Sequence, residues 1–89
     1  MKMNKVWTDE AWEDYLYWQT QDKKTLKRIN KLLNDIDRNG YNCIGKAEPL
    51  KYDLSGLWSV RIDHDNRIVF KIANDNLYIA QCGAHYRDK

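Results

Sequence analysis

The chain has 89 residues, 31% of them charged, with a net charge of +2, which suits one small globular domain over residues 1–89 and excludes a disordered chain. Its apolar runs are far shorter than the ~20 residues that cross a bilayer. The opening MKMNKVWTDE lacks the apolar segment of a secretory signal, so we expect a cytoplasmic protein with no membrane association.

Residues 3–7 favour a short strand, and a pair of helices is predicted to follow it. Thr8 is a suitable N-cap for the first helix, with acidic residues in the first turn. Its expected apolar stripe is Ala11, Trp12, Tyr15 and Leu16. Asp22 caps the second helix, which should end at Asn39-Gly40. Its apolar residues recur at helical spacing: Leu26, Ile29, Leu32, Leu33 and Ile36. The two helices should form an antiparallel hairpin.

The second predicted helix carries five cations within nine residues, which are Lys23, Lys24, Lys27, Arg28 and Lys31. At 3.6 residues per turn they gather on one side of the helix. Such a basic stripe can follow the phosphates of a nucleic acid. A merely solvated helix face explains the same pattern, so both interpretations stay open.

Residues 41–56 are predicted to be irregular, and a meander of three strands is expected after them. Apolar residues alternate with polar ones from Trp58 to Ile62 and from Ile68 to Ile72, and a last strand is expected near 77–82. Packing the apolar residues together pairs Val60 with Ile68 and leaves a three-residue loop at 63–65.

The same register places Arg61 directly opposite Arg67 on the polar face of the predicted sheet, which also carries Lys71. Two like charges in direct opposition are destabilising, so this face is suited to meet an anion. The alternative is that the neighbouring Asp63 and Asp65 neutralise the two arginines.

The chain has no phosphate-binding glycine loop, zinc signature or nucleophile elbow. Cys43 and Cys82 form no C-x-x-C pair and suit buried apolar positions in a reducing compartment. We predict neither metal nor cofactor.

What remains is a carboxylate, a histidine and several cations, the minimum set for metal-free RNA cleavage. These candidates are Glu48, Lys51, Arg61, Arg67, His85 and Tyr86. Taken singly, each also suits an ordinary loop or surface position.

Four ordered motifs make the chain resemble the YoeB/Txe toxins of the RelE superfamily. WTDEAWEDYLYW at 7–18 matches the family's W-[ST]-x-x-[AS]-W-x-D-Y-x-x-W, and GKAEPLK at 45–51 matches G-K-x-E-P-L-K. LSGLWSVRI at 54–62 matches L-S-G-x-W-S-x-R-I, and NRIVF at 66–70 precedes the closing His85-Tyr86. The resemblance implies an α+β fold in β-α-α-β-β-β order, with two N-terminal helices packed on a small twisted antiparallel sheet.

The resemblance also implies an activity, that of an mRNA interferase which cuts mRNA in the A site of the 70S ribosome without a metal. It makes Glu48 the general base, His85 the general acid and Arg67 the group that stabilises the transition state. Lys51 and Arg61 would assist at the phosphate, and Tyr86 would orient the substrate. The implied partner is an antitoxin of the YefM/Axe type, and a homodimer is left open.

Three alternatives remain open at this point. A carboxylate is a weak base at neutral pH, so Lys51 is a second candidate for the base. A catalytically weak protein that only blocks the A site, or a ribonuclease that acts without the ribosome, would carry the same motifs.

Overall fold

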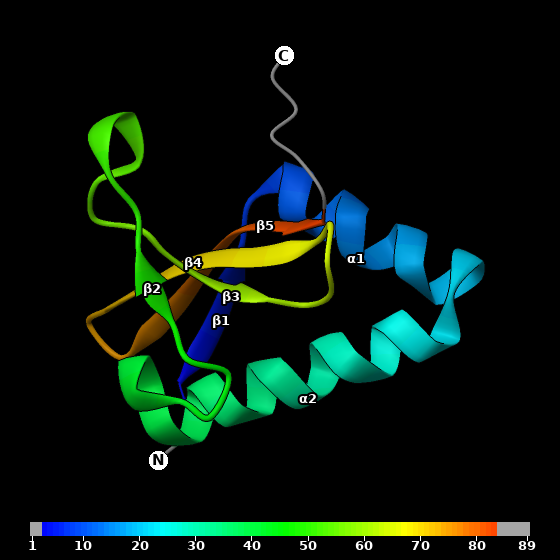
Figure 1. The fold of residues 1–89 in the computed structure, drawn as a ribbon, viewed down its shortest axis with the longest axis horizontal. Helices are drawn as coiled ribbons and strands as arrows, with labels where there is room; N and C mark the ends of the chain where they lie inside the picture. The colour runs from blue at the N-terminus through cyan, green and yellow to red at the C-terminus, as the bar shows by residue number, and fades with distance from the viewer. Residues whose placement is uncertain (1–2, 84–89) are drawn as a thin grey trace.

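The computed structural model describes residues 3–83 and confirms the expected α+β class. Two helices pack against a five-stranded sheet, whose first strand precedes them in the chain (Figure 1). The helices are α1 (Asp9–Gln21) and α2 (Lys23–Asn39). The strands are β1 (Asn4–Trp7), β2 (Glu48–Pro49), β3 (Trp58–Arg61), β4 (Arg67–Ala73) and β5 (Asn76–Gly83). Two short 3-10 turns, η1 (Gly40–Asn42) and η2 (Tyr52–Leu54), lie in the segment expected to be irregular.

The helices begin and end where their caps predict. Thr8 Oγ1 accepts a hydrogen bond from the backbone N–H of Ala11 at 3.1 Å, which satisfies one unpaired donor of α1. Asp22 ends α1 and caps α2, since its carboxylate accepts from the N–H groups of Lys24 and Thr25 at 3.1 and 3.2 Å. Gly40 ends α2 with φ of +62°, a conformation that suits glycine.

The predicted apolar stripe of α1 is half wrong. Ala11 is fully buried and Tyr15 packs on the core, but Trp12 and Leu16 are each 44% exposed. Trp18 packs on the core instead and is partly buried, and its indole N–H donates to the carbonyl of Cys82 at 2.8 Å. Contact with β5 therefore sets the rotation of α1, and hydrophobic spacing alone does not.

The sheet has the order β1-β5-β4-β3-β2 and is mixed, whereas an entirely antiparallel sheet was expected. The meander β3-β4-β5 is antiparallel, but β1 pairs with β5 in parallel. Lys5 in β1 forms an ion pair with Asp37 of α2, with 3.4 Å between Nζ and Oδ2, so α2 helps to fix the path of β1. Nothing in the local sequence of a short first strand specifies its direction.

The predicted register of the first hairpin is confirmed. Val60 pairs with Ile68 and Arg61 pairs with Arg67, and the loop between these strands spans 63–65. The second hairpin turns through Asn74 and Asp75, both with positive φ, as a two-residue turn between strands requires.

The main core lies between α2, α1 and one face of the sheet (Figure 1). It contains four of the five apolar residues predicted for α2, all but Leu26, and the alternate residues of the meander, with Ile29, Ile36, Ile68 and Phe70 fully buried. Burial of aliphatic and aromatic side chains supplies most of the stability of a chain this small. The opposite face of the sheet, here called the open face, carries the candidate site.

Helix α1 covers the part of β5 that β1 is too short to reach. Thr8 Oγ1 donates to the carbonyl of Ala80 at 3.1 Å, and Asp14 accepts from the N–H of Cys82 at 3.1 Å. Side chains of α1 thus satisfy backbone groups that an unpaired sheet edge would leave exposed. This contact fixes the end of β5 beside the open face.

Candidate functional site

Arg67 on β4 is the centre of the candidate site. Its Nη1 donates to Ser59 Oγ at 3.1 Å, and Ser59 is almost fully buried on the neighbouring strand β3. A guanidinium has five N–H donors, and within residues 3–83 no carboxylate forms an ion pair with Arg67. The hydrogen bond orients the group and leaves its other donors for an anion.

The two acidic residues of the 63–65 loop do not neutralise the arginine pair. Asp63 accepts hydrogen bonds from the backbone N–H groups of Asp65 and Asn66, both at 2.9 Å, and so holds the loop together. Asp65 contacts His64 instead. In the described part of the chain, neither Arg61 nor Arg67 has an acidic partner within 4 Å. The open face thus carries an unneutralised pair of cations.

Strand β2 brings Glu48 to the same face. Glu48 pairs with Ser59 in the register of β2 and β3, one row from the Arg61–Arg67 pair. Paired residues of an antiparallel sheet share a face, so the carboxylate and both guanidinium groups lie on one side. The sequence placed Glu48 in an irregular loop, and only the structure reveals the strand that positions it.

Asp35 on α2 anchors the loop that precedes β2. Its carboxylate accepts from the backbone N–H of Ile44 at 3.0 Å and of Gly45 at 2.9 Å. Burial raises the pKa of Asp35, but these two hydrogen bonds, one from Asn39 and the charge of Arg38 outweigh it and leave the pKa below its ordinary value. Gly45 fits closely, because a Cβ there would lie 3.0 Å from the Leu32 side chain.

These elements enclose a cavity of about 250 Å³ on the open face, here called the basic cavity. Its lining residues are Gly45, Lys46, Glu48, Ser59, Arg61 and Arg67. Sequence reasoning missed Lys46 and Ser59, although both stand inside the quoted motifs. Lys51, predicted to assist at the phosphate, does not line this cavity.

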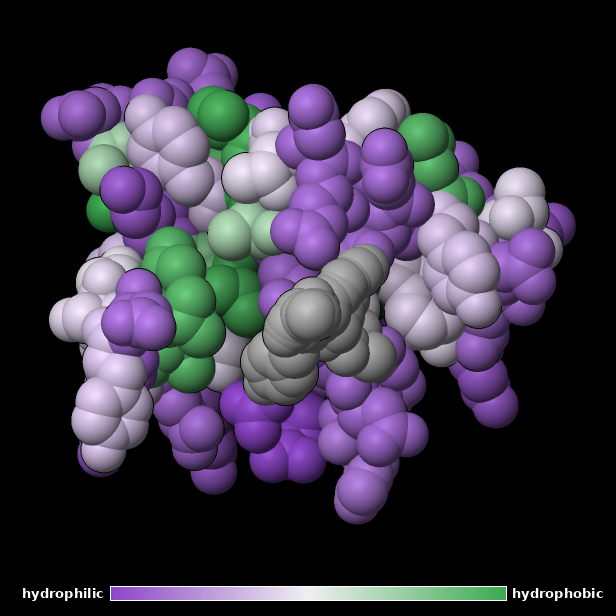
Figure 2. Space-filling view, turned by 90° about the horizontal axis from the view of Figure 1, so that it is seen from above, coloured by the Kyte–Doolittle hydropathy of each residue, from purple (hydrophilic) through white to green (hydrophobic). Residues whose placement is uncertain are grey.

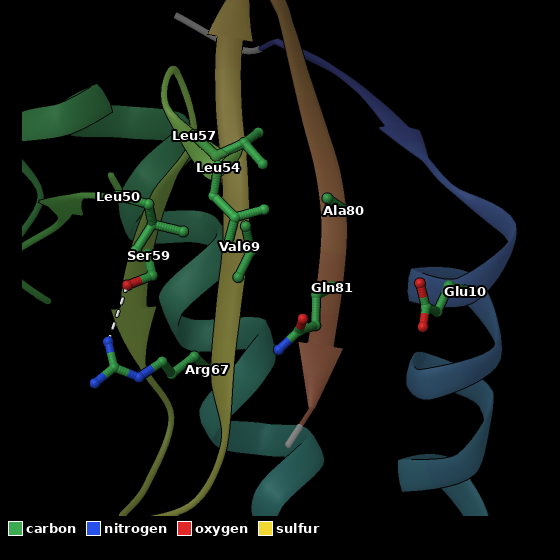
Figure 3. Close-up of a pocket in the computed structure, with 9 residues that line it drawn as sticks. All are labelled: Glu10, Leu50, Leu54, Leu57, Ser59, Arg67, Val69, Ala80 and Gln81. Carbon is green, nitrogen blue, oxygen red and sulfur yellow. Dashed lines mark hydrogen bonds between the residues drawn. The ribbon is translucent and has the colours of Figure 1, made fainter. Parts of the chain in front are cut away.

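A second hollow of about 210 Å³, here called the apolar hollow, adjoins the basic cavity and shares Ser59 and Arg67 with it. Figure 3 shows its leucines and Val69 at one end, and Arg67, Gln81 and Glu10 toward the other. Figure 2 views the molecule from the side opposite α2 and shows a green apolar group next to strongly hydrophilic residues.

His85 and Tyr86 lie outside the described residues. What the structure does describe is the strand that leads to them. Val69 pairs with Gln81 and Phe70 with Ile79, so Ala80 is an extra residue in β5. The bulge reverses the alternation: Leu77 and Ile79 face the core before it, and Cys82 faces the core after it. The reversal thus lies at Ala80, ahead of the last residues of β5.

All five cations of the predicted basic stripe are exposed along α2. Arg28 has a structural contact as well, because its Nε donates to the carbonyl of Ile62 at 3.1 Å and joins α2 to the end of β3. Lys23, Lys24, Lys27 and Lys31 make no ion pair within the described ranges. Exposure alone suits either interpretation of the stripe.

Both cysteines are buried free thiols, as predicted. Burial, with the nearby charge of Asp14, raises the pKa of Cys82 to about 12, so this thiol is unreactive. Residues 3–83 contain no group of three or more His, Cys, Asp or Glu side chains arranged to hold a metal ion. No described helix is long and apolar enough to cross a membrane.

Comparison with known proteins identifies the family. Residues 7–86 match the model of the YoeB-like toxin of bacterial type II toxin–antitoxin systems. The chain belongs to this family. It is 48% identical to the toxin YoeB of Escherichia coli K12 over 84 residues, which is 94% of this chain and all of that protein.

Solved structures of YoeB proteins share the fold. The YoeB dimer from Staphylococcus aureus is 45% identical, with a TM-score of 0.87 over 97% of this chain and all of that chain. YoeB in a YoeB–YefM complex from the same organism is 44% identical, with the same TM-score and coverage. The YoeB resemblance inferred from the four motifs is thus confirmed.

Proposed function

We propose that this YoeB-family toxin is an endoribonuclease that cuts mRNA in the ribosomal A site and so stops translation. One observation carries the proposal: Glu48, Arg61 and Arg67 line a single cavity on the open face. A carboxylate beside cations without acidic partners is an arrangement that can remove a proton and stabilise a phosphate at the same place.

The proposed reaction is a transesterification. Glu48 takes the proton of a 2′-OH, and the 2′-oxygen attacks the adjacent phosphorus. The bond from phosphorus to the 5′-oxygen then breaks, and His85 donates its proton to the departing oxygen. The products are a 2′,3′-cyclic phosphate and a 5′-hydroxyl. No metal takes part in this scheme.

The cations of the basic cavity stabilise the charge that develops on the phosphorus oxygens. Arg67 does so directly, because Ser59 orients its guanidinium, and Arg61 and Lys46 line the same cavity. Fixed donors are effective here because they need not reorganise during the reaction. Glu48 is favoured over Lys51 as the base since only Glu48 lines this cavity. Tyr86 is proposed to orient the substrate.

The site is an open cavity on a sheet face, so the toxin itself offers little to hold a flexible RNA in line for attack. We propose that the ribosome supplies this constraint, with rRNA phosphates bound by the basic stripe of α2. The S. aureus relatives form a YoeB–YefM complex and a dimer. We propose a YefM/Axe-type antitoxin as the neutralising partner of this toxin too, and a homodimer as a further assembly.

Single-turnover cleavage on ribosomes programmed with a defined mRNA tests the proposal. Glu48→Ala and His85→Ala should each slow cleavage at least about 10²-fold, the lower range for a general acid or base. Chelation by EDTA should leave the rate unchanged where the ribosomes are stabilised by polyamines. If the ribosomes stall on intact mRNA, the toxin blocks the A site without cutting.

A further inference from the structure

The apolar hollow has no role in the reaction proposed above, yet it opens beside the residues that carry it. It shares Ser59 and Arg67 with the basic cavity. Any group held in the hollow is therefore a direct neighbour of a phosphate held by Arg67. The two spaces together match the layout of a nucleotide. The basic cavity suits its anionic part, and the apolar hollow suits its flat, largely apolar part.

The walls of the hollow are aliphatic. Leu50, Leu54 and Leu57, from the segment that joins β2 to β3, stand over Val69 (Figure 3). Val69 faces the open side of β4 but is only 6% exposed, and it does not belong to the main core. Leu54 is 44% exposed and forms part of the rim. Apolar side chains of this kind can enclose the faces of an unstacked base.

The other end of the hollow is polar. The Nε2 of Gln81 donates to the carbonyl of Gly83 at 3.1 Å, which fixes the amide. Its Oε1 accepts no hydrogen bond within residues 3–83, and Figure 3 shows the amide on the side toward Arg67. An amide oxygen accepts from the N–H groups on the edge of a base.

We propose that the apolar hollow binds the nucleobase next to the scissile phosphate, a proposal that rests on the proposed ribonuclease function. The lining favours a base over an acidic peptide. Most of it is aliphatic, and its two charged residues, Glu10 and Arg67, have opposite signs, so the hollow suits a neutral, largely apolar group with N–H donors better than a carboxylate.

The test combines a pocket variant with a modified message. Leu54→Ser removes part of the apolar wall, and Leu16→Ser is the matched control because Leu16 is also 44% exposed but lies on α1 away from the hollow. Each protein cuts either an ordinary message or one in which the nucleotide beside the scissile phosphate is abasic. The abasic nucleotide keeps the ribose 2′-OH and the phosphate.

With the parent toxin, loss of the base on one side of the scissile phosphate should slow cleavage about tenfold, within the range of one stacked base. Leu54→Ser should slow cleavage of the ordinary message by a similar factor and leave the abasic message at the parent's rate. Such non-additivity indicates direct contact. The unchanged rate on the abasic message also shows that the variant is folded. Leu16→Ser should match the parent throughout.

Three results would overturn the inference. The first is that the parent cuts the abasic message as fast as the ordinary one, whichever flanking base is removed. The second is that Leu54→Ser, with an unchanged melting temperature, slows cleavage of both messages equally. The third is that Leu54→Ser cuts normally but binds a YefM-type antitoxin more weakly, which would make the hollow a peptide site. A parent that cuts neither message refutes the proposed function itself, so the two failures are distinguishable.

Discussion

Replacement of Asp35 by asparagine tests how the loop that carries Lys46 and Glu48 is held. The Asp35 carboxylate accepts from the backbone N–H groups of Ile44 and Gly45 through its two different oxygens. An asparagine retains one acceptor oxygen and presents an NH2 group to the second N–H. One charge-assisted hydrogen bond is therefore lost and one donor is left without a protein partner.

Such a bond contributes about 1.5–3 kcal/mol, and the lower value applies because Asp35 is partly exposed to water. The free energy of unfolding at pH 7 should fall by about 1.5 kcal/mol, which lowers the melting temperature of a chain this size by roughly 6–12 °C. Cleavage at 25 °C should fall about tenfold, since the loop positions Glu48 less well.

The pH dependence gives the sharper check. The pKa of Asp35 lies below its ordinary value in the folded protein, so the ionised form contributes stability that is present above about pH 4. This contribution is lost as the pH falls through the folded-state pKa. Asparagine does not titrate, so the parent and Asp35→Asn should differ at pH 7 and converge toward pH 3.

Thermal melting at both pH values, at constant ionic strength, measures the effect. Asp53→Asn is the matched control, because Asp53 is an exposed carboxylate of η2 with no hydrogen-bond partner within residues 3–83. It should melt like the parent at either pH. The reasoning is refuted if Asp35→Asn costs less than about 0.5 kcal/mol at pH 7, since the carboxylate would then not anchor the loop. An equal difference at pH 3 and pH 7 would remove the charge from the explanation.

Three further outcomes are expected. Arg67→Ala should slow single-turnover cleavage about 10²–10³-fold, whereas Lys71→Ala, an exposed cation of the same strand, should stay within about twofold; equal losses would show that only net charge matters. Ser59→Ala should lower the same rate about five- to tenfold, because Arg67 loses its orienting acceptor, and full activity would show that this orientation is unimportant. Glutamate at both Lys23 and Lys27 should weaken ribosome binding and flatten its salt dependence, measured by filter binding at several KCl concentrations; unchanged affinity and slope would make the stripe a solvated face.

Local chemistry in the sequence determined a large part of this fold. Thr8, Asp22 and Gly40 mark the helix ends, because caps act within one turn of the chain. The alternation of apolar residues determined the register that places Arg61 opposite Arg67, since a shift by one residue would turn every apolar side chain to the wrong face. The motifs around these residues were sufficient to indicate the family.

Contacts between distant segments decided the rest, and they are the contacts that build the site. A two-residue strand such as β2 has no periodicity of its own, so only its pairing with β3 brings Glu48 to the arginines. The rotation of α1 follows from its hydrogen bonds to the edge of β5. The bulge at Ala80 changes the face on which the last residues of β5 lie. Each of these features depends on backbone groups that find their partners only when the chain has folded, and such pairing leaves no local pattern in the sequence.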